Sequence, residues 1–185
     1  KISFNKPIYF SDETSIVSGW FKGTTTFGST TLSSSGDADG FVTKLDSNGN
    51  VLWAKQFGGT GTDAVYDISL SGENCFISGF FNSSVAFGDV TLTSNGGDDS
   101  FYAKLDSNGD VVWAKSYGSS GDESGYDIKV LPDDSSIISG NFRNSVNFFG
   151  TTLTSAGSSD GVVAKLDSNG SVSWIKHLSG TNLDY

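Results

Sequence analysis

The residues best suited to chemistry in this chain are side-chain oxygens that lie together in a turn. Asp46, Asn48 and Asn50 place an oxygen at every second position, which is how the first ligands of a calcium-binding loop are spaced. No Glu follows at the twelfth position, where such loops supply a bidentate ligand. The same residues also suit a tight hairpin, because Asp accepts backbone N–H groups and Asn-Gly tolerates positive φ angles. We therefore predict a hairpin turn and no cofactor, with a calcium site as the alternative.

Acidic pairs are the groups that could catalyse a reaction. Neighbouring carboxylates such as Asp37 and Asp39 could serve a glycosidase as acid and nucleophile. However, acids of this kind are spread along the chain at regular intervals, as in the set Asp39, Asp99 and Asp160. One catalytic site needs its groups in one place, so we predict that the recurring acids make hydrogen bonds in turns or between units.

Two further residues have side chains that are often catalytic, His177 and Cys75. His177 is the only histidine, and the positions equivalent to it earlier in the chain hold Gln56 and Ser116. We interpret His177 as a variable polar position. Cys75 is the only cysteine, which excludes an intramolecular disulfide and a zinc site built on several thiolates. The sequence predicts no catalytic residues, no bound metal and no enzyme activity.

Aromatic residues with polar neighbours are the candidates for ligand binding. Two sets of positions are spaced by 60 and 61 residues but differ in residue type: Trp20, Phe80 and Asn141, and, two places further on, Lys22, Asn82 and Arg143. Aromatic rings at such variable positions can stack on a sugar or hold a protein loop. We predict that Trp20, Phe80, Lys22 and Arg143 bind a ligand. The alternative is that the rings fill space between neighbouring sheets.

The spacing of these residues follows from an internal repeat. The hexapeptide Lys-Leu-Asp-Ser-Asn-Gly occupies residues 44–49, 104–109 and 165–170, and a Trp recurs at the same step as Trp53, Trp113 and Trp174. Self-similarity at a fixed period indicates a repeat architecture. We predict three units, residues 1–63, 64–124 and 125–185, which together form one domain.

Each unit contains four short runs with the composition of β-strands. In the second unit these cover roughly residues 66–70, 75–81, 101–106 and 111–117, and residues 85–97 add a short hairpin. Apolar residues are consecutive in the third run, which indicates a sheet that is covered on both faces. No amphipathic helix is present to cover it. We therefore predict an all-β fold of four-stranded antiparallel β-propeller blades. A β-helix has shorter coils, and a β-sandwich would not explain three copies.

Composition limits the classes of partner. The chain has 185 residues, a formal charge of −10 and a pI near 4.2, so it is repelled by nucleic acid and by anionic lipid. No apolar run approaches the roughly 18 residues of a membrane-spanning helix. We predict no nucleic-acid partner and no membrane insertion.

The repeat resembles a known family. Residues 99–113, the tripeptide Gly-Asp-Glu at 121–123 and the tripeptide Ile-Ser-Gly at 138–140 are similar to landmarks of the SBBP-type β-propeller repeats of secreted and surface bacterial proteins. The resemblance covers essentially the whole chain. It implies an extracellular or cell-surface location, and it carries over no catalytic residue.

Three units are few for a propeller, because propellers close with about four to eight blades. We expect a partial propeller with apolar faces at both ends, whose partners are further blades of a longer chain or other subunits of a homo-oligomer. The predicted function is that of an extracellular, non-enzymatic module that mediates protein or glycan interaction or adhesion. The alternative is a structural building block of a surface filament or a larger secreted assembly.

Overall fold

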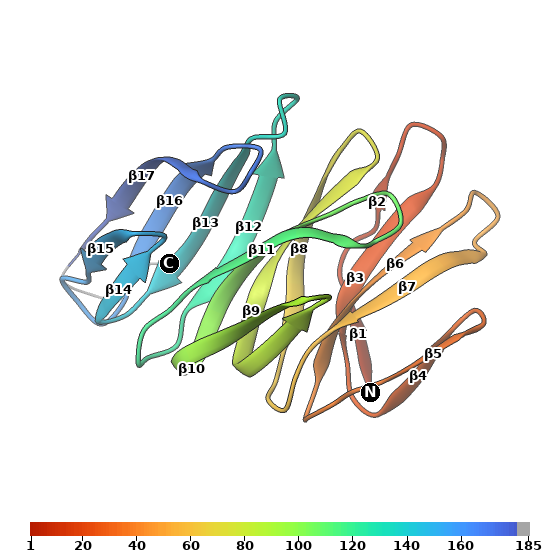
Figure 1. Cartoon of the computed structure of the whole chain (residues 1–185), viewed down its shortest axis with the longest axis horizontal. Helices are drawn as coiled ribbons and strands as arrows, with labels where there is room; N and C mark the ends of the chain where they lie inside the picture. Colours follow the sequence, from red (N-terminus) through yellow and green to blue (C-terminus); the bar gives the residue numbers. More distant parts are fainter. Residues whose placement is uncertain (181–185) are drawn as a thin grey trace.

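The fold is all-β, as the sequence predicts. The computed structural model describes residues 1–180, which form strands and turns with no helix (Figure 1). None of these residues therefore belongs to a helix that could cross a membrane. The strands form three main antiparallel sheets, none of which is closed, and these follow one another along the chain. We name them sheet 1, sheet 2 and sheet 3.

The strands of each main sheet come from one stretch of sequence. Sheet 2 contains β8 (Ala64–Ser71), β9 (Asn74–Phe87), β10 (Val90–Leu105) and β11 (Val111–Tyr117). Sheet 3 contains β12 (Ser124–Val130), β13 (Ser136–Phe142), β16 (Asp160–Leu166) and β17 (Val172–Leu178). Sheet 1 contains β1 (Ile2–Phe4), β2 (Ile8–Tyr9), β3 (Ser15–Phe21), β6 (Asp39–Leu45) and β7 (Val51–Phe57). Neighbouring strands are therefore consecutive in sequence, apart from β1, which pairs with β3, and from the hairpins described next.

The predicted extra hairpin is present, and it differs between the sheets. In sheet 2 it is an extension of β9 and β10, in which Phe87 pairs with Val90 and Ser84 pairs with Thr93. Beside the other sheets it is a separate two-stranded ribbon, made of β4 (Thr24–Phe27) and β5 (Thr30–Ser33) or of β14 (Ser145–Phe148) and β15 (Thr151–Thr154).

Sheet 1 departs from the predicted four strands because its first strand is divided. β1 and β2 both pair with β3, so this sheet has five strands. Pro7 stands between them and has no N–H group with which to continue the ladder. Sheets 2 and 3 have the four strands that the sequence predicts.

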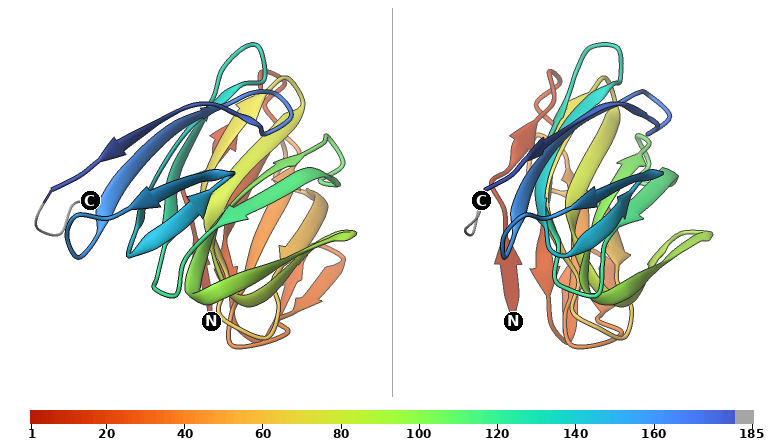
Figure 2. Two further views of the ribbon diagram at one scale, coloured as in Figure 1. Left: turned by 60° about the vertical axis from the view of Figure 1, so that its left-hand side comes forward. Right: turned by 90° about the vertical axis from the view of Figure 1, so that its left-hand side faces the viewer.

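Both faces of sheet 2 are covered by the neighbouring sheets, as expected from its consecutive apolar residues. Phe101 packs in a cluster with Ile16 and Val42 of sheet 1. The next residue, Tyr102, packs in a second cluster with Ile138 of sheet 3. Successive side chains of a strand point to opposite faces, so one strand serves both layers. The three sheets form a row, and in a view along this row they lie one behind another (Figure 2).

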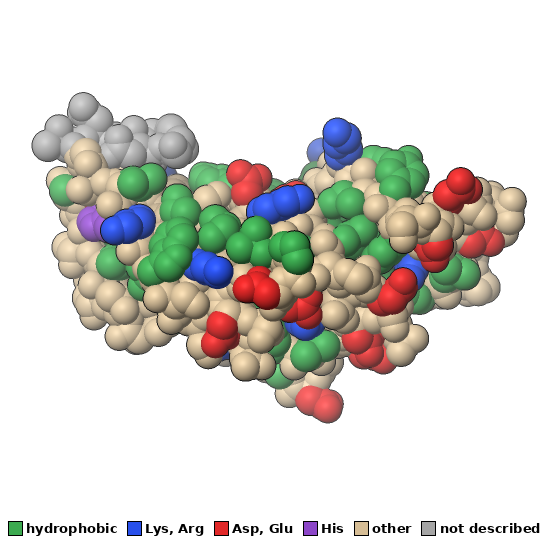
Figure 3. Space-filling view, turned by 90° about the horizontal axis from the view of Figure 1, so that it is seen from above, with side chains coloured by type: hydrophobic (Ala, Val, Ile, Leu, Met, Phe, Trp, Pro, Cys, Tyr) green, Lys and Arg blue, Asp and Glu red, His purple; other side chains and the backbone are tan. Residues whose placement is uncertain are grey.

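The recurring Trp and Lys residues join neighbouring sheets. Trp53 Nε1 donates to the carbonyl of Ser107 at 3.0 Å, and Trp113 Nε1 donates to the carbonyl of Ser168 at 3.2 Å. Ion pairs repeat in the same way, Lys44 with Glu73 at 3.3 Å and Lys104 with Asp134 at 2.7 Å. On the face of the molecule seen from above, basic and acidic side chains are interspersed with hydrophobic ones (Figure 3). The two junctions are therefore built from equivalent contacts.

Candidate functional site

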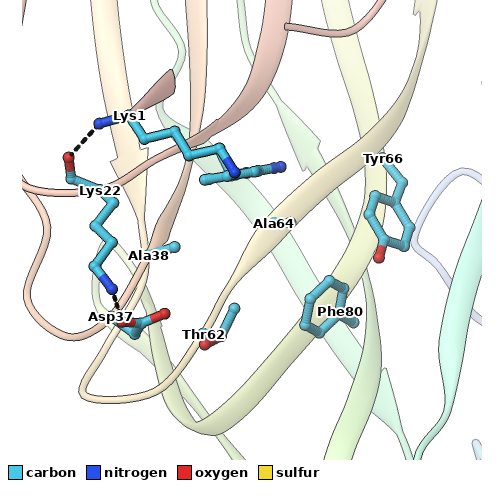
Figure 4. A pocket seen from close by; sticks show the side chains of 9 residues that line it. Lys1, Lys22, Asp37, Ala38, Thr62, Ala64, Tyr66 and Phe80 are labelled. Atoms are coloured by element: carbon cyan, nitrogen blue, oxygen red, sulfur yellow. Dashed lines mark hydrogen bonds and ion pairs between the residues drawn. The ribbon is translucent and has the colours of Figure 1, made fainter. Parts of the chain in front are cut away.

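A pocket of about 290 Å³ lies where sheets 1 and 2 meet (Figure 4). Its lining is aromatic, polar and charged: Lys1, Trp20, Lys22, Asp37, Ala38, Thr62, Ala64, Tyr66 and Phe80. Three of the four predicted binding residues, Trp20, Lys22 and Phe80, therefore lie in one place. We call this the aromatic pocket.

The repeat explains why Trp20 and Phe80 lie on the same side of the molecule. Trp20 in β3 pairs with Gly40 of β6, and Phe80 in β9 pairs with Ala64 of β8. Trp20 of β3 and Phe80 of β9 are therefore at equivalent positions of two sheets that lie next to each other. Equivalent positions of neighbouring units thus form two walls of one pocket.

Tyr66 is placed by a β-bulge. The pairing of β8 with β9 shifts register between Val65 and Asp67, which leaves Tyr66 without an opposite residue. Bulges redirect the side chain of the extra residue. The Tyr66 ring lies 5.2 Å from the Phe80 ring and is 40% exposed. The bulge therefore adds a third ring, which lies in contact with the second.

Charged side chains surround the rings. The Lys1 ammonium lies 5.2 Å from the centre of the Trp20 ring, and Lys22 forms an ion pair with Asp37. Both members of that pair are more than half exposed, so a ligand can reach them. The pocket combines apolar ring faces with two cations, one anion and the Thr62 hydroxyl.

The buried carboxylate of Asp63 holds the segment that contains the lining residues Thr62 and Ala64 in place. Ala38 and Thr62 form a short parallel bridge, and the Asp63 N–H donates to the Ala38 carbonyl at 2.8 Å. The Asp63 side chain is fully buried and accepts the backbone N–H groups of Gly59 at 2.9 Å and of Asn82 at 3.3 Å. Burial raises the pKa of Asp63 to about 7, and the nearby charges of Asp39 and Asp98 add to the effect.

Arg143 lies outside the aromatic pocket. Its guanidinium Nη1 is 4.0 Å from Asp122 Oδ2, and its backbone N–H donates to Glu123 Oε1 at 3.1 Å. These contacts belong to the junction between sheets 2 and 3. The structure therefore brings together three of the predicted residues and places the fourth at the next junction.

Sequence reasoning missed Tyr66 as a site residue. A signal was available, because Tyr66-Asp67 recurs sixty residues later as Tyr126-Asp127. The pairing of β12 with β13 also shifts register around Tyr126. A repeated Tyr-Asp pair at the start of a strand thus marks a repeated bulge.

The calcium-like turn binds its own backbone. Asp46 Oδ1 accepts the N–H groups of Asn48 at 2.9 Å and Asn50 at 2.8 Å, and Gly49 has a φ of +81°. Asp106 and Asp167 make the same pair of bonds in their turns. The hairpin prediction is confirmed. Residues 1–180 contain no cluster of three or more His, Cys, Asp and Glu side chains that could hold a metal ion.

The second recurring acid is a buried anchor. Asp39, Asp99 and Asp160 are fully buried, and each accepts the backbone N–H group of the residue four places earlier. Burial raises the pKa of Asp99 to about 6 and also raises that of Asp39. For Asp160, burial is outweighed by hydrogen bonds from Ala156 and His177, and the pKa is lowered. The predicted role in turn hydrogen bonding is confirmed.

His177, interpreted above as a variable polar position, binds one of these buried carboxylates. His177 Nε2 lies 2.6 Å from Asp160 Oδ2, and Gln56 Nε2 donates to Asp39 Oδ2 at the same distance. The residue type varies between the units, yet both side chains bind the buried carboxylate. Position 177 is therefore part of the interior hydrogen-bonding network.

Comparisons with known proteins give no assignment. The chain matches no protein-family model. A search of curated proteins finds no match either. The resemblance to SBBP-type repeats stays a prediction from the residues.

Proposed function

We propose that this chain is an extracellular, non-enzymatic module of β-propeller type that binds a glycan in the aromatic pocket. Three antiparallel sheets joined by equivalent contacts support the propeller architecture. The convergence of three aromatic rings from two sheets supports binding. Protein ligands are the competing class, and the experiment below distinguishes the two.

The chemistry of the lining favours a sugar. The apolar face of a sugar ring can lie on the rings of Trp20, Tyr66 and Phe80, as aromatic side chains offer a flat apolar surface. Its hydroxyl groups can meet Lys22, Asp37 and Thr62 at the rim. A volume of about 290 Å³ is at the lower end of small-ligand pockets and suits a terminal sugar unit.

The direct test is a glycan array followed by titration calorimetry with the best-bound glycan. Trp20→Ala should weaken binding by about tenfold or more, because a buried aromatic contact of this kind is worth more than about 1.4 kcal/mol. Phe80→Ala should act in the same direction.

Arg143→Ala is the matched control for Lys22→Ala, since Arg143 occupies the equivalent position outside the pocket. Lys22→Ala should weaken binding and Arg143→Ala should leave it unchanged. If the array shows no bound glycan, or if Arg143→Ala weakens binding as much as Trp20→Ala, the proposal is wrong. Binding of a peptide in place of a glycan would also overturn it.

A further inference from the structure

Within residues 1–180, sheets 1 and 3 each have one face that no other sheet covers. These two faces carry the residues that are in contact with each other at the junctions between sheets 1 and 2 and between sheets 2 and 3. At the internal junctions a Trp of one sheet lies against the turn of the next. A Cβ atom on Gly109 would come within 2.9 Å of the Trp53 ring, and one on Gly170 within 3.2 Å of the Trp113 ring. A Cβ atom on the equivalent Gly49 would meet no atom of another part of the described chain within 4 Å, and the third Trp, Trp174, is 40% exposed. The Trp174 ring and the Gly49 turn, at opposite ends of the molecule, therefore lack the contact that their counterparts make.

Apolar residues at the two ends are also more exposed than their counterparts at the internal junctions. Phe57 and Tyr117 are equivalent residues at the internal junctions and are 3% and 2% exposed, whereas their counterpart Leu178 in sheet 3 is 54% exposed. On sheet 1, Phe4 pairs with Gly19 as Val65 pairs with Gly79. Phe4 is 59% exposed and Val65 is fully buried.

Charge is also complementary between the two ends. Each internal junction pairs a Lys with an acid in the turn of the next sheet, Lys44 with Glu73 and Lys104 with Asp134. The third Lys of this series is Lys165, on sheet 3. The acid equivalent to Asp134 in sheet 1 is Glu13, which shares its positive φ angle (67° and 61°).

We propose that the face of sheet 3 with Trp174, Leu178 and Lys165 docks on the face of sheet 1 with Phe4, Glu13 and Gly49 of a second copy of this chain. The contact repeats the internal junction: the Trp174 ring lies over Gly49, its N–H donates to the Ser47 carbonyl, and Lys165 pairs with Glu13. Both halves are on every copy, so the contact is head-to-tail. Two such contacts close a ring of two copies.

This docking is independent of the glycan proposal, because it uses faces that do not line the aromatic pocket. Two copies in a ring contain six main sheets, within the four to eight blades with which propellers close.

The first test is the mass of the chain in solution, measured by light scattering across a concentration series. We expect twice the chain mass of 19.4 kDa. Leu178→Ser should return the chain to 19.4 kDa at the same concentration. Leu52→Ser is the matched control, because Leu52 is also 54% exposed and its equivalent Val112 stays 56% exposed in sheet 2, whose two faces are both covered. It should leave the doubled mass unchanged.

The second test establishes the orientation of the contact. Lys165→Glu and Glu13→Lys should each weaken dimerisation at least severalfold, and the two changes in one chain should restore it.

Circular dichroism of each variant checks that it is folded. A wild-type monomer at every concentration overturns the proposal. A dimer that Leu178→Ser leaves intact, or one that Lys165→Glu weakens while Glu13→Lys has no effect, also overturns it.

Discussion

Trp113 and Ser168 link sheets 2 and 3 through one hydrogen bond, from the indole Nε1 to the backbone carbonyl at 3.2 Å. The same bond links sheets 1 and 2 through Trp53 and Ser107. Each Trp therefore joins the last strand of one sheet to the last turn of the next.

Trp113→Phe should lower the free energy of unfolding by about 1 kcal/mol, because the ring remains but the hydrogen bond is lost. Trp113→Ala should cost about 3 kcal/mol, since the ring contact with the Gly170 turn is lost as well. Urea denaturation measures both values. Val112→Ser is the control, because Val112 is on the same strand and 56% exposed, and it should change stability by less than about 0.5 kcal/mol. Equal effects of Trp113→Phe and Val112→Ser would contradict the prediction.

The Lys104–Asp134 pair should contribute stability that depends on pH. Hydrogen bonds from Lys104 and Ser71 lower the pKa of Asp134 below its ordinary value of 3.8. A carboxyl with a lowered pKa stabilises the fold above that ordinary value, and the stabilisation is lost as the pH falls through the lower pKa of the folded state. Asp134→Asn should therefore cost about 2 kcal/mol at pH 7 and much less near pH 2.

The control for this pair is Glu73→Gln. Its ion pair with Lys44 is more exposed, with the Glu73 side chain at 64%, and should contribute less than about 1 kcal/mol. Urea titrations of both variants at the two pH values give the comparison. If Asp134→Asn costs the same at both pH values, the assigned cause is wrong.

Stability should fall between pH 5 and pH 8 because of Asp63. Burial raises its pKa to about 7, so the folded chain binds a proton in this range that the unfolded chain has already released. Folding is therefore favoured on the acidic side and weakened as Asp63 ionises. Asp99, with a pKa raised to about 6, acts in the same direction. Melting temperatures across this range measure the trend.

Asp63→Asn should make that dependence less steep, because Asn does not ionise and the contribution of Asp99 remains. Asp122→Asn is the control, since the Asp122 side chain is 62% exposed and its removal should leave the slope unchanged. A steep slope that persists in Asp63→Asn would assign the effect to another group.

Gly59→Ala should destabilise the chain strongly. A Cβ atom at this position would lie 1.7 Å from the backbone carbonyl oxygen of Ser84, which cannot move away as a flexible side chain would. We expect a loss of more than about 3 kcal/mol, or roughly 6–12 °C in melting temperature. Gly161→Ala is the control, because the nearest atom to its Cβ position is 3.5 Å away, and its melting temperature should stay within a few degrees. Similar melting temperatures for the two variants would argue against a close approach at Gly59.

Residues that recur at a fixed spacing were the reliable source of sequence prediction. The Asp46 turn is a hairpin because its bonds lie within five residues, so the local sequence contains all of its partners. The consecutive apolar residues around Tyr102 correctly indicated a sheet that is covered on both faces.

Other features depend on contacts between strands, and the sequence did not reveal them. The role of His177 follows from a pairing that brings it next to Asp160, seventeen residues earlier. The exposure of Tyr66 follows from a register shift against β9. The separation of Arg143 from Trp20 follows from the order of the sheets in space, which equivalent positions in a repeat do not specify.

The two junctions have the same polarity, from a Trp and a Lys of the earlier sheet to turns of the later sheet. This arrangement allows the chain to change in length by whole units. At each junction a Trp and a Lys of one sheet contact turns of the next sheet. Each unit therefore offers the same two sets of contacts to its neighbours. Deleting residues 64–124 would bring Trp53 opposite the Ser168 turn and Lys44 opposite Asp134. Both pairs already have compatible chemistry. Whole units can thus be gained or lost without a new interface having to evolve, and the number of sheets is a variable of this fold.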